Sequence, residues 1–442
     1  DFGHARHLFP DADVFPCVIS VQKPDTDAAP EQYDLAVIPR DDVPREGLSA
    51  AVHAATYRAE RADLTEEAWV LEPPDVADLL RKIRERGVPL EEYAGVSPLY
   101  GIKTGFNEAF LIDTATRDQL VSEDPKAAEI IKPYLRGQDI ERWQPEWAGL
   151  WMIFARRGID IERYPSVLRH LETFRTQLQP KPADWQPPRN NAKWPGRKTG
   201  SYHWYEIQDA VDYWRQFEAP KIIYQVIQYY PSFSFDSAGY FGNDKCFALP
   251  TADQSLCAIL NSPLMWWHNW RALPHLKDEA LSPMGYLMAK LPISSPLPGD
   301  KSEFDELSCS AINATSSIKS SDVLLADWLK FEHPIINIST VLRESSKLDV
   351  DGFVAAVRSA LPKRQGLTPT QLRQLREAFS ETAEPARQAR IELLAYERRL
   401  AAMVERAYGL TDEEIALMWR TAPPRMPLAP PPGLDLRPLT TE

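Results

Sequence analysis

Apolar residues occur through most of this chain in short runs, each bounded by glycine, proline or polar residues. Runs rich in valine and isoleucine predict strands at residues 14–23 and 33–39, joined as a hairpin at a sheet edge. Strands are also expected at residues 150–155 and 221–230. Residues 233–249 predict two more strands about an Asp-Ser-Ala-Gly turn.

Two central stretches carry a pattern of their own. Residues 100–113 (YGIKTGFNEAFLID) contain an apolar run broken by the turn residues Thr104, Gly105 and Phe106, which predicts a hairpin. Residues 130–143 (IIKPYLRGQDIERW) echo this arrangement and end in an Arg-Gly-Gln-Asp turn, so they predict a polar-tipped loop nearby. Basic and amide side chains on loops fit a surface that reads a ligand better than a catalytic centre.

Helical spacing is clearest near the C-terminus. Thr368 begins a capping box, and residues 386–407 carry apolar side chains at alternating steps of three and four, which predicts a helix that needs a partner helix. Gly409 ends this helix, and Thr411 caps a last short one. Further helices are expected at residues 75–86, after Pro165, after Asp253 and from Ser262.

Strands and helices alternate irregularly, without a strict β-α-β order, so the sequence predicts an α+β fold. Residues 295–346 are weakly patterned and rich in serine and proline, and they predict a linker around one short helix at residues 323–331. The tail from Pro423 is rich in proline and is expected to be extended.

Composition narrows the function little. The 442 residues, 44% hydrophobic and 26% charged, suffice for two or three ordinary globular domains. A net charge of −13 argues against a uniformly basic protein, although nucleic-acid binding needs only a local basic patch. No run predicts a membrane span, and four scattered cysteines favour a reducing, cytoplasmic location. Because the chain starts with Asp1, we interpret it as the C-terminal piece of a longer protein or as a processed chain.

The stretch most typical of a nucleic-acid surface is residues 181–205, with five cations against one acid and several interleaved aromatic residues. Cations neutralise phosphates, aromatic faces stack on bases, and arginine or asparagine can read base edges. The alternative is a proline-ordered surface loop whose aromatic residues anchor it to the core. The candidate contacts in this loop are Arg189, Asn190, Asn191, Lys193, Arg197, Lys198 and Tyr202.

The turns of the two central stretches supply further polar side chains that could touch phosphates or bases. The alternative for them is structural: Thr104 and Gly105 would simply make a turn, and Arg136 would pair with Asp139. The candidates here are Lys103, Thr104, Asn107, Arg136 and Gln138.

A metal site is not expected. Cys246, Cys257, His268 and His275 are residue types that bind zinc, but their intervals are far wider than those of paired zinc ligands, so we expect buried thiols. The sequence also lacks a phosphate-binding glycine-rich loop, a G-x-S-x-G elbow and an H-E-x-x-H motif. Any active site would therefore lie mostly outside this chain.

The two central stretches, together with residues 219–227 (APKIIYQVI), 256–267 (LCAILNSPLMWW) and 287–293 (LMAKLPI), resemble a TaqI-type target-recognition domain. That domain occurs in type IIG restriction-modification enzymes and in adenine-specific DNA methyltransferases. Residues 1–23 are similar to the last strands of the family's methyltransferase sheet, and residues 406–418 resemble its C-terminal helix.

The resemblance implies an upstream domain that binds S-adenosylmethionine and methylates a flipped adenine through an Asn-Pro-Pro-Tyr motif. That motif does not occur here, so no catalytic residue or cofactor site is expected within the chain. The expected partners are double-stranded DNA and the upstream methyltransferase domain. The expected segments are methyltransferase strands (1–60), a helical connector (61–96), a target-recognition domain (97–294), a linker (295–346), a helical domain with a coiled-coil-like hairpin (347–422) and a proline-rich tail (423–442).

Two other functions fit the same residues: a stand-alone DNA-binding specificity subunit, and an RNA- or protein-binding scaffold that uses the helical seam. Neither the recognition sequence, nor DNA cleavage by the parent enzyme, nor the oligomeric state follows from the sequence.

Overall fold

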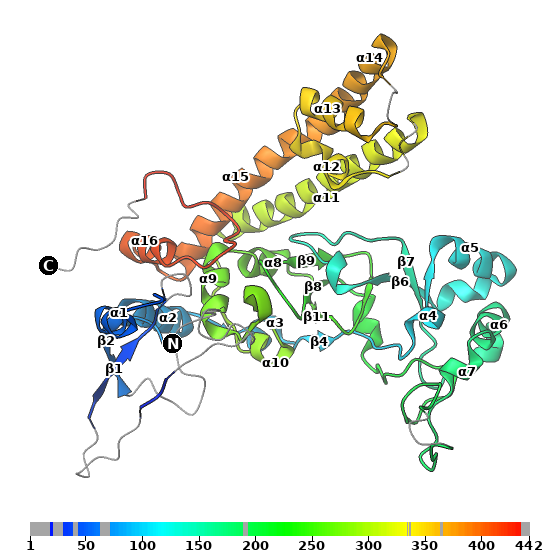
Figure 1. The fold of residues 1–442 in the computed structure, drawn as a ribbon, viewed down its shortest axis with the longest axis horizontal. Coiled ribbons are helices and arrows are strands. Elements are labelled where there is room, and N and C mark those ends of the chain that lie inside the picture. Colours follow the sequence, from blue (N-terminus) through cyan, green and yellow to red (C-terminus); the bar gives the residue numbers. More distant parts are fainter. Residues whose placement is uncertain are drawn as a thin grey trace.

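The computed structural model describes residues 18–20, 30–38, 43–61, 71–188, 193–333, 335, 337–362 and 366–434. Within this part of the chain, short strands and helices form a central body, and two long helices project from it as an arm (Figure 1). Strands and helices mix without a β-α-β repeat, so the predicted α+β class is confirmed.

Two four-stranded sheets form the centre of the body. Their strands are β4 (Leu99–Tyr100), β5 (Leu111–Asp113), β6 (Ile131–Leu135), β7 (Leu150–Ile153), β8 (Lys221–Gln225), β9 (Phe233–Asp236), β10 (Phe241–Gly242) and β11 (Cys246–Pro250). One sheet has the order β10-β6-β7-β5 and the other the order β4-β11-β8-β9. Only the β10 to β6 pairing is parallel within these two sheets.

Shorter pairings surround these sheets. In the described residues they are β1 (Gln32–Ala36) with β2 (Thr56–Glu60), β3 (Val88–Pro89) with β14 (Pro292–Ile293), and β12 (His275–Leu276) with β13 (Ala280–Leu281). The β3 to β14 pair joins the start of the central body to its end, so the chain enters and leaves this region at one place.

Strands β8 and β9 are held by a buried ion pair. Lys221 and Asp236 face each other in the antiparallel register, and both side chains are fully buried. The Lys221 ammonium also donates to the carbonyl of Phe217, and the Asp236 carboxylate accepts from the N–H groups of residues 238–240. Because these groups satisfy each other, the two charges are tolerated in an apolar surrounding.

Amphipathic helices cover the sheets. Helix α2 (Pro74–Arg86) packs Val76, Leu79, Leu80 and Ile83 into the core that contains β8, β9 and the nearly all-buried helices α8 (Gln254–Leu260) and α9 (Pro263–Ala272). Helices α5 (Thr114–Glu123), α6 (Pro165–Glu172) and α7 (Arg175–Leu178) lie beside the other sheet (Figure 1). The helices predicted after Asp253 and from Ser262 are confirmed, and each of these two residues caps its helix by accepting a backbone N–H of the first turn.

The arm is an antiparallel helix pair. Helix α11 (Lys301–Glu332) runs outward, and α15 (Glu384–Ala407) returns along it, with α12 (Thr340–Arg343), α13 (Val350–Ala360) and α14 (Pro369–Ala378) at the far end (Figure 1). The capping boxes of α14 and α16 (Asp412–Arg420) and the partner helix required by residues 386–407 are confirmed.

The expected linker at residues 295–346 is wrong, because most of it is helix α11, 32 residues long. Sequence periodicity missed this helix because its buried face contains Ser308 and Thr315, whose hydroxyls donate to the carbonyls of Phe304 and Ala311 one turn earlier. Small polar residues satisfied in this way can be buried between helices while weakening the apolar pattern.

The hairpin expected at residues 100–113 is also wrong, because its strands pair with strands far along the chain. β4 pairs with β11 and β5 with β7, with the short helix α4 (Asn107–Phe110) between β4 and β5 in the chain. The strands expected on either side of the Asp-Ser-Ala-Gly turn are confirmed as β9 and β10, but β9 pairs with β8, whereas β10 joins the other sheet. At the N-terminus β1 pairs with β2, and residues 14–17 and 21–23 lie outside the described part of the chain.

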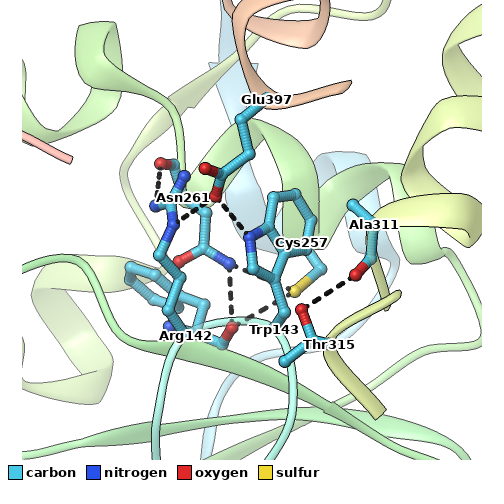
Figure 2. A network of polar contacts seen from close by, with 8 residues as sticks. Arg142, Trp143, Cys257, Asn261, Ala311, Thr315 and Glu397 are labelled. Carbon is cyan, nitrogen blue, oxygen red and sulfur yellow. Dashed lines mark hydrogen bonds and ion pairs between the residues drawn. The ribbon is translucent and has the colours of Figure 1, made fainter. Parts of the chain in front are cut away.

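A polar junction attaches the arm to the central body (Figure 2). One oxygen of Glu397, on α15, accepts from Arg142 Nε at 2.8 Å and from Trp143 Nε1 at 2.6 Å. Arg142 also donates to the carbonyl of Asn261, at the end of α8. The Asn261 amide in turn pairs with the backbone of Phe233 on β9, at 3.1 and 2.8 Å. A second clamp is formed by Lys319 of α11, which bonds the Glu141 carboxylate and the Gln144 carbonyl, both at 2.7 Å.

None of the described helices combines the length and apolar character needed to cross a membrane. The boundaries of the expected domains stay predictions.

Replacing Glu397 by alanine should loosen the arm. The change leaves Arg142 and the Trp143 indole without their acceptor, and we expect the free energy of unfolding to fall by roughly 2–4 kcal/mol. Chemical denaturation and amide hydrogen exchange along α15 measure the effect. Glu384→Ala is the control, because Glu384 makes only an exposed ion pair with Arg387 on the same helix and should cost less than about 1 kcal/mol. Equal losses of stability for the two variants would show that the Glu397 junction does not stabilise the arm.

Stability should also depend on Glu405 of α15. Burial raises the pKa of this carboxyl to about 7, so the fold favours its protonated form. The contribution of Glu405 to the free energy of unfolding is fully present below the unfolded pKa of about 4.5. It is lost as pH rises through about 7 and the carboxyl ionises in the folded protein. We expect Glu405→Gln to be more stable than the parent by roughly 2–3 kcal/mol at pH 8, and the advantage to vanish near pH 4.5. Denaturation curves across this pH range test it, and parallel curves would disprove it.

Candidate nucleic-acid interface

Arg197, a predicted DNA contact, is buried at the base of the basic loop. Only 4% of the residue is exposed. Its five N–H donors all bond backbone carbonyls: Nε bonds Leu178, Nη1 bonds Thr104 and Glu206, and Nη2 bonds His203 and Trp204. The prediction that Arg197 contacts DNA is therefore corrected: no donor is left for a ligand, and the residue holds the loop to the two segments around it.

Two other candidates are buried beside it. The Tyr202 ring lies 4.4 Å from the Arg197 guanidinium carbon, and its hydroxyl donates to the Lys198 carbonyl. The Thr104 hydroxyl donates to Asn107 Oδ1 at 2.7 Å. Both Thr104 and Tyr202 have structural roles, as the alternative interpretation held for Thr104. A side chain at Gly105, whose φ is +86°, would collide with Arg197 and Gln208, so this turn requires glycine.

Arg136 is used within its own turn. Its guanidinium makes a bidentate pair with Asp139, whose carboxylate also accepts the Arg136 backbone N–H at 2.8 Å. The hydrogen bonds raise the pKa of Arg136 slightly further from neutrality. This pairing is the structural alternative stated for the turn, and it leaves Gln138 exposed at its tip.

The aromatic residues of the basic loop are mostly anchors. Trp194 donates to the Gln179 carbonyl at 3.1 Å and packs edge-on against Trp185 at 5.7 Å. The ammonium of Lys181 lies 4.8 Å from the Trp185 ring, and Arg175 lies 4.6 Å from the Trp204 ring. These contacts support the interpretation of an ordered surface loop for much of this segment.

Exposed polar candidates remain around this core. Lys193, Lys198, Lys103, Asn107 and Gln138 are all exposed. Lys103 makes one long ion pair, 3.8 Å from Asp244. Arg189, Asn190 and Asn191 lie outside the described residues.

The turn at residues 242–246 brings the two central stretches together. The N–H of Ile102 donates to Gly242, and the N–H of Asn243 donates to Leu135, at 2.8 and 3.0 Å. Lys103 and Gln138 therefore lie on either side of one turn, which also carries the exposed Lys245. The sequence did not single out Lys245, because its neighbours Lys103 and Gln138 are more than 100 positions away.

A groove of about 480 Å³ opens beside the loop. The Lys103 N–H donates to the Asp209 carboxylate at 2.9 Å, so the groove adjoins the turn just described. Sequence reasoning missed Arg157 and residues 208–213, because they lie outside the basic window and only folding places them there. The groove is lined by Arg157, Lys198, Thr199, Gly200, Tyr202, Gln208, Asp209, Ala210 and Tyr213.

The cysteine and histidine residues behave as core residues. Burial raises the pKa of the Cys246 thiol and raises that of Cys257 to about 12, and both thiols are free. Burial lowers the pKa of His268 to about 4. The prediction of buried thiols is confirmed for Cys246 and Cys257 but is wrong for Cys309, which is exposed. Within the described ranges no three histidine, cysteine or acidic residues gather as metal ligands.

Comparison with known proteins identifies the centre of this arrangement. Residues 132–293 match the model of the TaqI-like C-terminal specificity domain. This part of the chain, which contains the Arg136 turn, the basic loop and most of both sheets, is thus a TaqI-type specificity domain, as predicted. Residues 298–404, which form the arm, match a domain of unknown function, DUF8810.

Other comparisons add little. No curated protein matches the chain. Among solved structures, the type IIL restriction-modification enzyme MmeI in complex with DNA is similar at 13% identity with a TM-score of 0.32, over 69% of this chain. The chain spans 36% of MmeI's length.

Arg197→Lys should destabilise the protein even though it conserves charge. Burial lowers the pKa of Arg197 to about 10, so it is protonated at neutral pH, and a lysine cannot reach five carbonyls. We expect a loss of roughly 2–4 kcal/mol in the free energy of unfolding and faster proteolysis near the loop. Arg175→Lys, at an exposed position over Trp204, is the control and should change stability by less than about 0.5 kcal/mol. An unchanged melting curve for Arg197→Lys would show that Arg197 does not stabilise the fold.

Proposed function

We propose that this chain recognises a specific sequence in double-stranded DNA as the specificity portion of a restriction-modification enzyme or adenine-specific DNA methyltransferase. The observation that carries the proposal is the match of residues 132–293 to the TaqI-like specificity domain. The exposed polar residues Lys103, Gln138 and Lys198 on that body and just before it support the proposal, because phosphate contacts fix register and amides can read base edges.

The catalytic half is proposed to lie upstream. In this proposal an S-adenosylmethionine-dependent methyltransferase domain acts on an adenine that the specificity domain has selected. The Asn-Pro-Pro-Tyr motif of such domains does not occur in this sequence, so no catalytic step is assigned to residues of this chain.

The competing functions make different demands on the surface. An RNA- or protein-binding scaffold would use the arm, where Leu324 and Phe331 are 64% and 87% exposed on one face of α11. The arm lies outside the specificity-domain match, so variants there separate the two functions.

Selection from a randomised duplex library tests the proposal on the full chain. We expect repeated rounds of capture to enrich one short sequence that is bound at least about 1,000-fold more tightly than its scrambled version. Leu324→Ser on the arm should leave both affinities unchanged. Indifference between duplexes, combined with equal binding of heparin, would refute sequence recognition and favour a scaffold.

A further inference from the structure

The groove beside the basic loop has the features of a site for a single anion. Lys198 is exposed on its rim and, within the described part of the chain, pairs with no carboxylate. Arg157 joins the two walls, since Nη1 donates to Ser201 Oγ at 3.0 Å and Nη2 donates to the Gln208 carbonyl at 2.7 Å. Two cations therefore face one carboxylate, that of Asp209.

The backbone of the rim adds donors. Among the described residues, no acceptor bonds the N–H groups of residues 198–202, five successive amides. The loop is held in place from below, because the Tyr202 hydroxyl bonds the Lys198 carbonyl and the Tyr202 ring covers Arg197. A side chain at Gly200 would lie 2.1 Å from that ring, so the rim fits only without one. Successive free amides beside fixed cations form the kind of concavity that binds oxyanions.

Asp209 supplies the negative charge of the groove lining and so lowers the groove's net positive charge. The Asp209 carboxylate accepts a hydrogen bond from the Lys103 backbone N–H, and this bond partly compensates the negative charge of Asp209. The groove nevertheless retains an excess of one positive charge in a protein whose net charge is −13. An acidic protein repels DNA over most of its surface, so a local cationic groove decides where the DNA backbone approaches.

We propose that this groove binds one phosphate of the DNA backbone and so sets the register of the duplex on the specificity domain without reading a base. Lys198 supplies the charge, the amides of residues 198–202 supply hydrogen bonds, and Arg157 keeps the walls apart at a fixed width. The inference rests on the proposed function for its ligand, but the groove's chemistry, one monovalent oxyanion at a time, follows from the lining alone.

Three variants of the full chain test this inference. Lys198→Gln removes the charge at an exposed side chain, and Asp209→Asn removes the opposing charge while keeping a carbonyl for the Lys103 N–H. Lys126→Gln is the control, because Lys126 is an exposed lysine of the central body that does not line the groove. Dissociation constants for the selected duplex and its scrambled version are measured by fluorescence anisotropy over a range of salt concentrations. Melting temperatures confirm that each variant folds.

Loss of one phosphate contact should lower the slope of log affinity against log salt by about 0.9, which corresponds to roughly eightfold weaker binding near 0.1 M salt. We expect this for Lys198→Gln on both duplexes equally, tighter binding for Asp209→Asn, and less than about twofold change for Lys126→Gln.

Each alternative result overturns a defined part. Equal losses for Lys198→Gln and Lys126→Gln would show diffuse electrostatic attraction and would contradict a phosphate site in the groove. A loss confined to the selected duplex would make Lys198 a base reader. If the parent chain binds all duplexes alike but Lys198→Gln still flattens the salt slope, the phosphate site stands and the proposed sequence recognition falls.

Discussion

The rest of the architecture depends on the junction of Arg142 and Trp143 with Glu397. The segment that contains these two residues follows the Arg136 turn and runs beside β9. Both arm helices bond this segment, α15 through Glu397 and α11 through Lys319. Trp143 adopts a left-handed φ of 72° that only surrounding contacts can hold, and its N–H and carbonyl exchange hydrogen bonds with Phe233 and Phe235. This short segment therefore positions both the arm and the sheet that contains β9, which is part of the specificity domain.

Other polar groups, buried in the central body, also hold separate segments of the chain together. Lys221 with Asp236 holds β8 against β9, and Arg197 collects five carbonyls from three segments. A buried charge is costly unless every donor and acceptor is satisfied, so each of these groups tolerates one arrangement of its neighbours and disfavours the others. The consequence is a rigid base for loops that would otherwise have many conformations.

Local signals in the sequence were sufficient where contacts are local. The caps at Asp253, Ser262, Thr368 and Thr411 use side chains that bond amides two or three residues away, so their residue types predict them. The hairpin expected at residues 100–113 failed because β4 and β5 pair with strands far along the chain, which no local pattern encodes. The same limit applies to the site. Lysine and arginine count equally in a basic stretch, and only folding reveals that Arg197 is enclosed while Lys198, the next residue, is exposed.

This division between arginine and lysine bears on how the domain would meet DNA. The arginines near the candidate surface are committed to the fold: Arg136 to Asp139, Arg142 to Glu397, and Arg197 to the backbone. No donor of Arg197 is left for guanine, and the Nε and Nη2 edge of Arg136 already bonds Asp139. Among the predicted DNA contacts that the structure describes, the exposed cations are lysines, which act as point charges and suit phosphates. Direct reading of bases then falls to neutral amides, of which Gln138, at the tip of a turn fixed by the Arg136–Asp139 pair, has the most rigid support. A surface built in this way separates a salt-sensitive contribution to affinity from a salt-insensitive contribution to sequence choice.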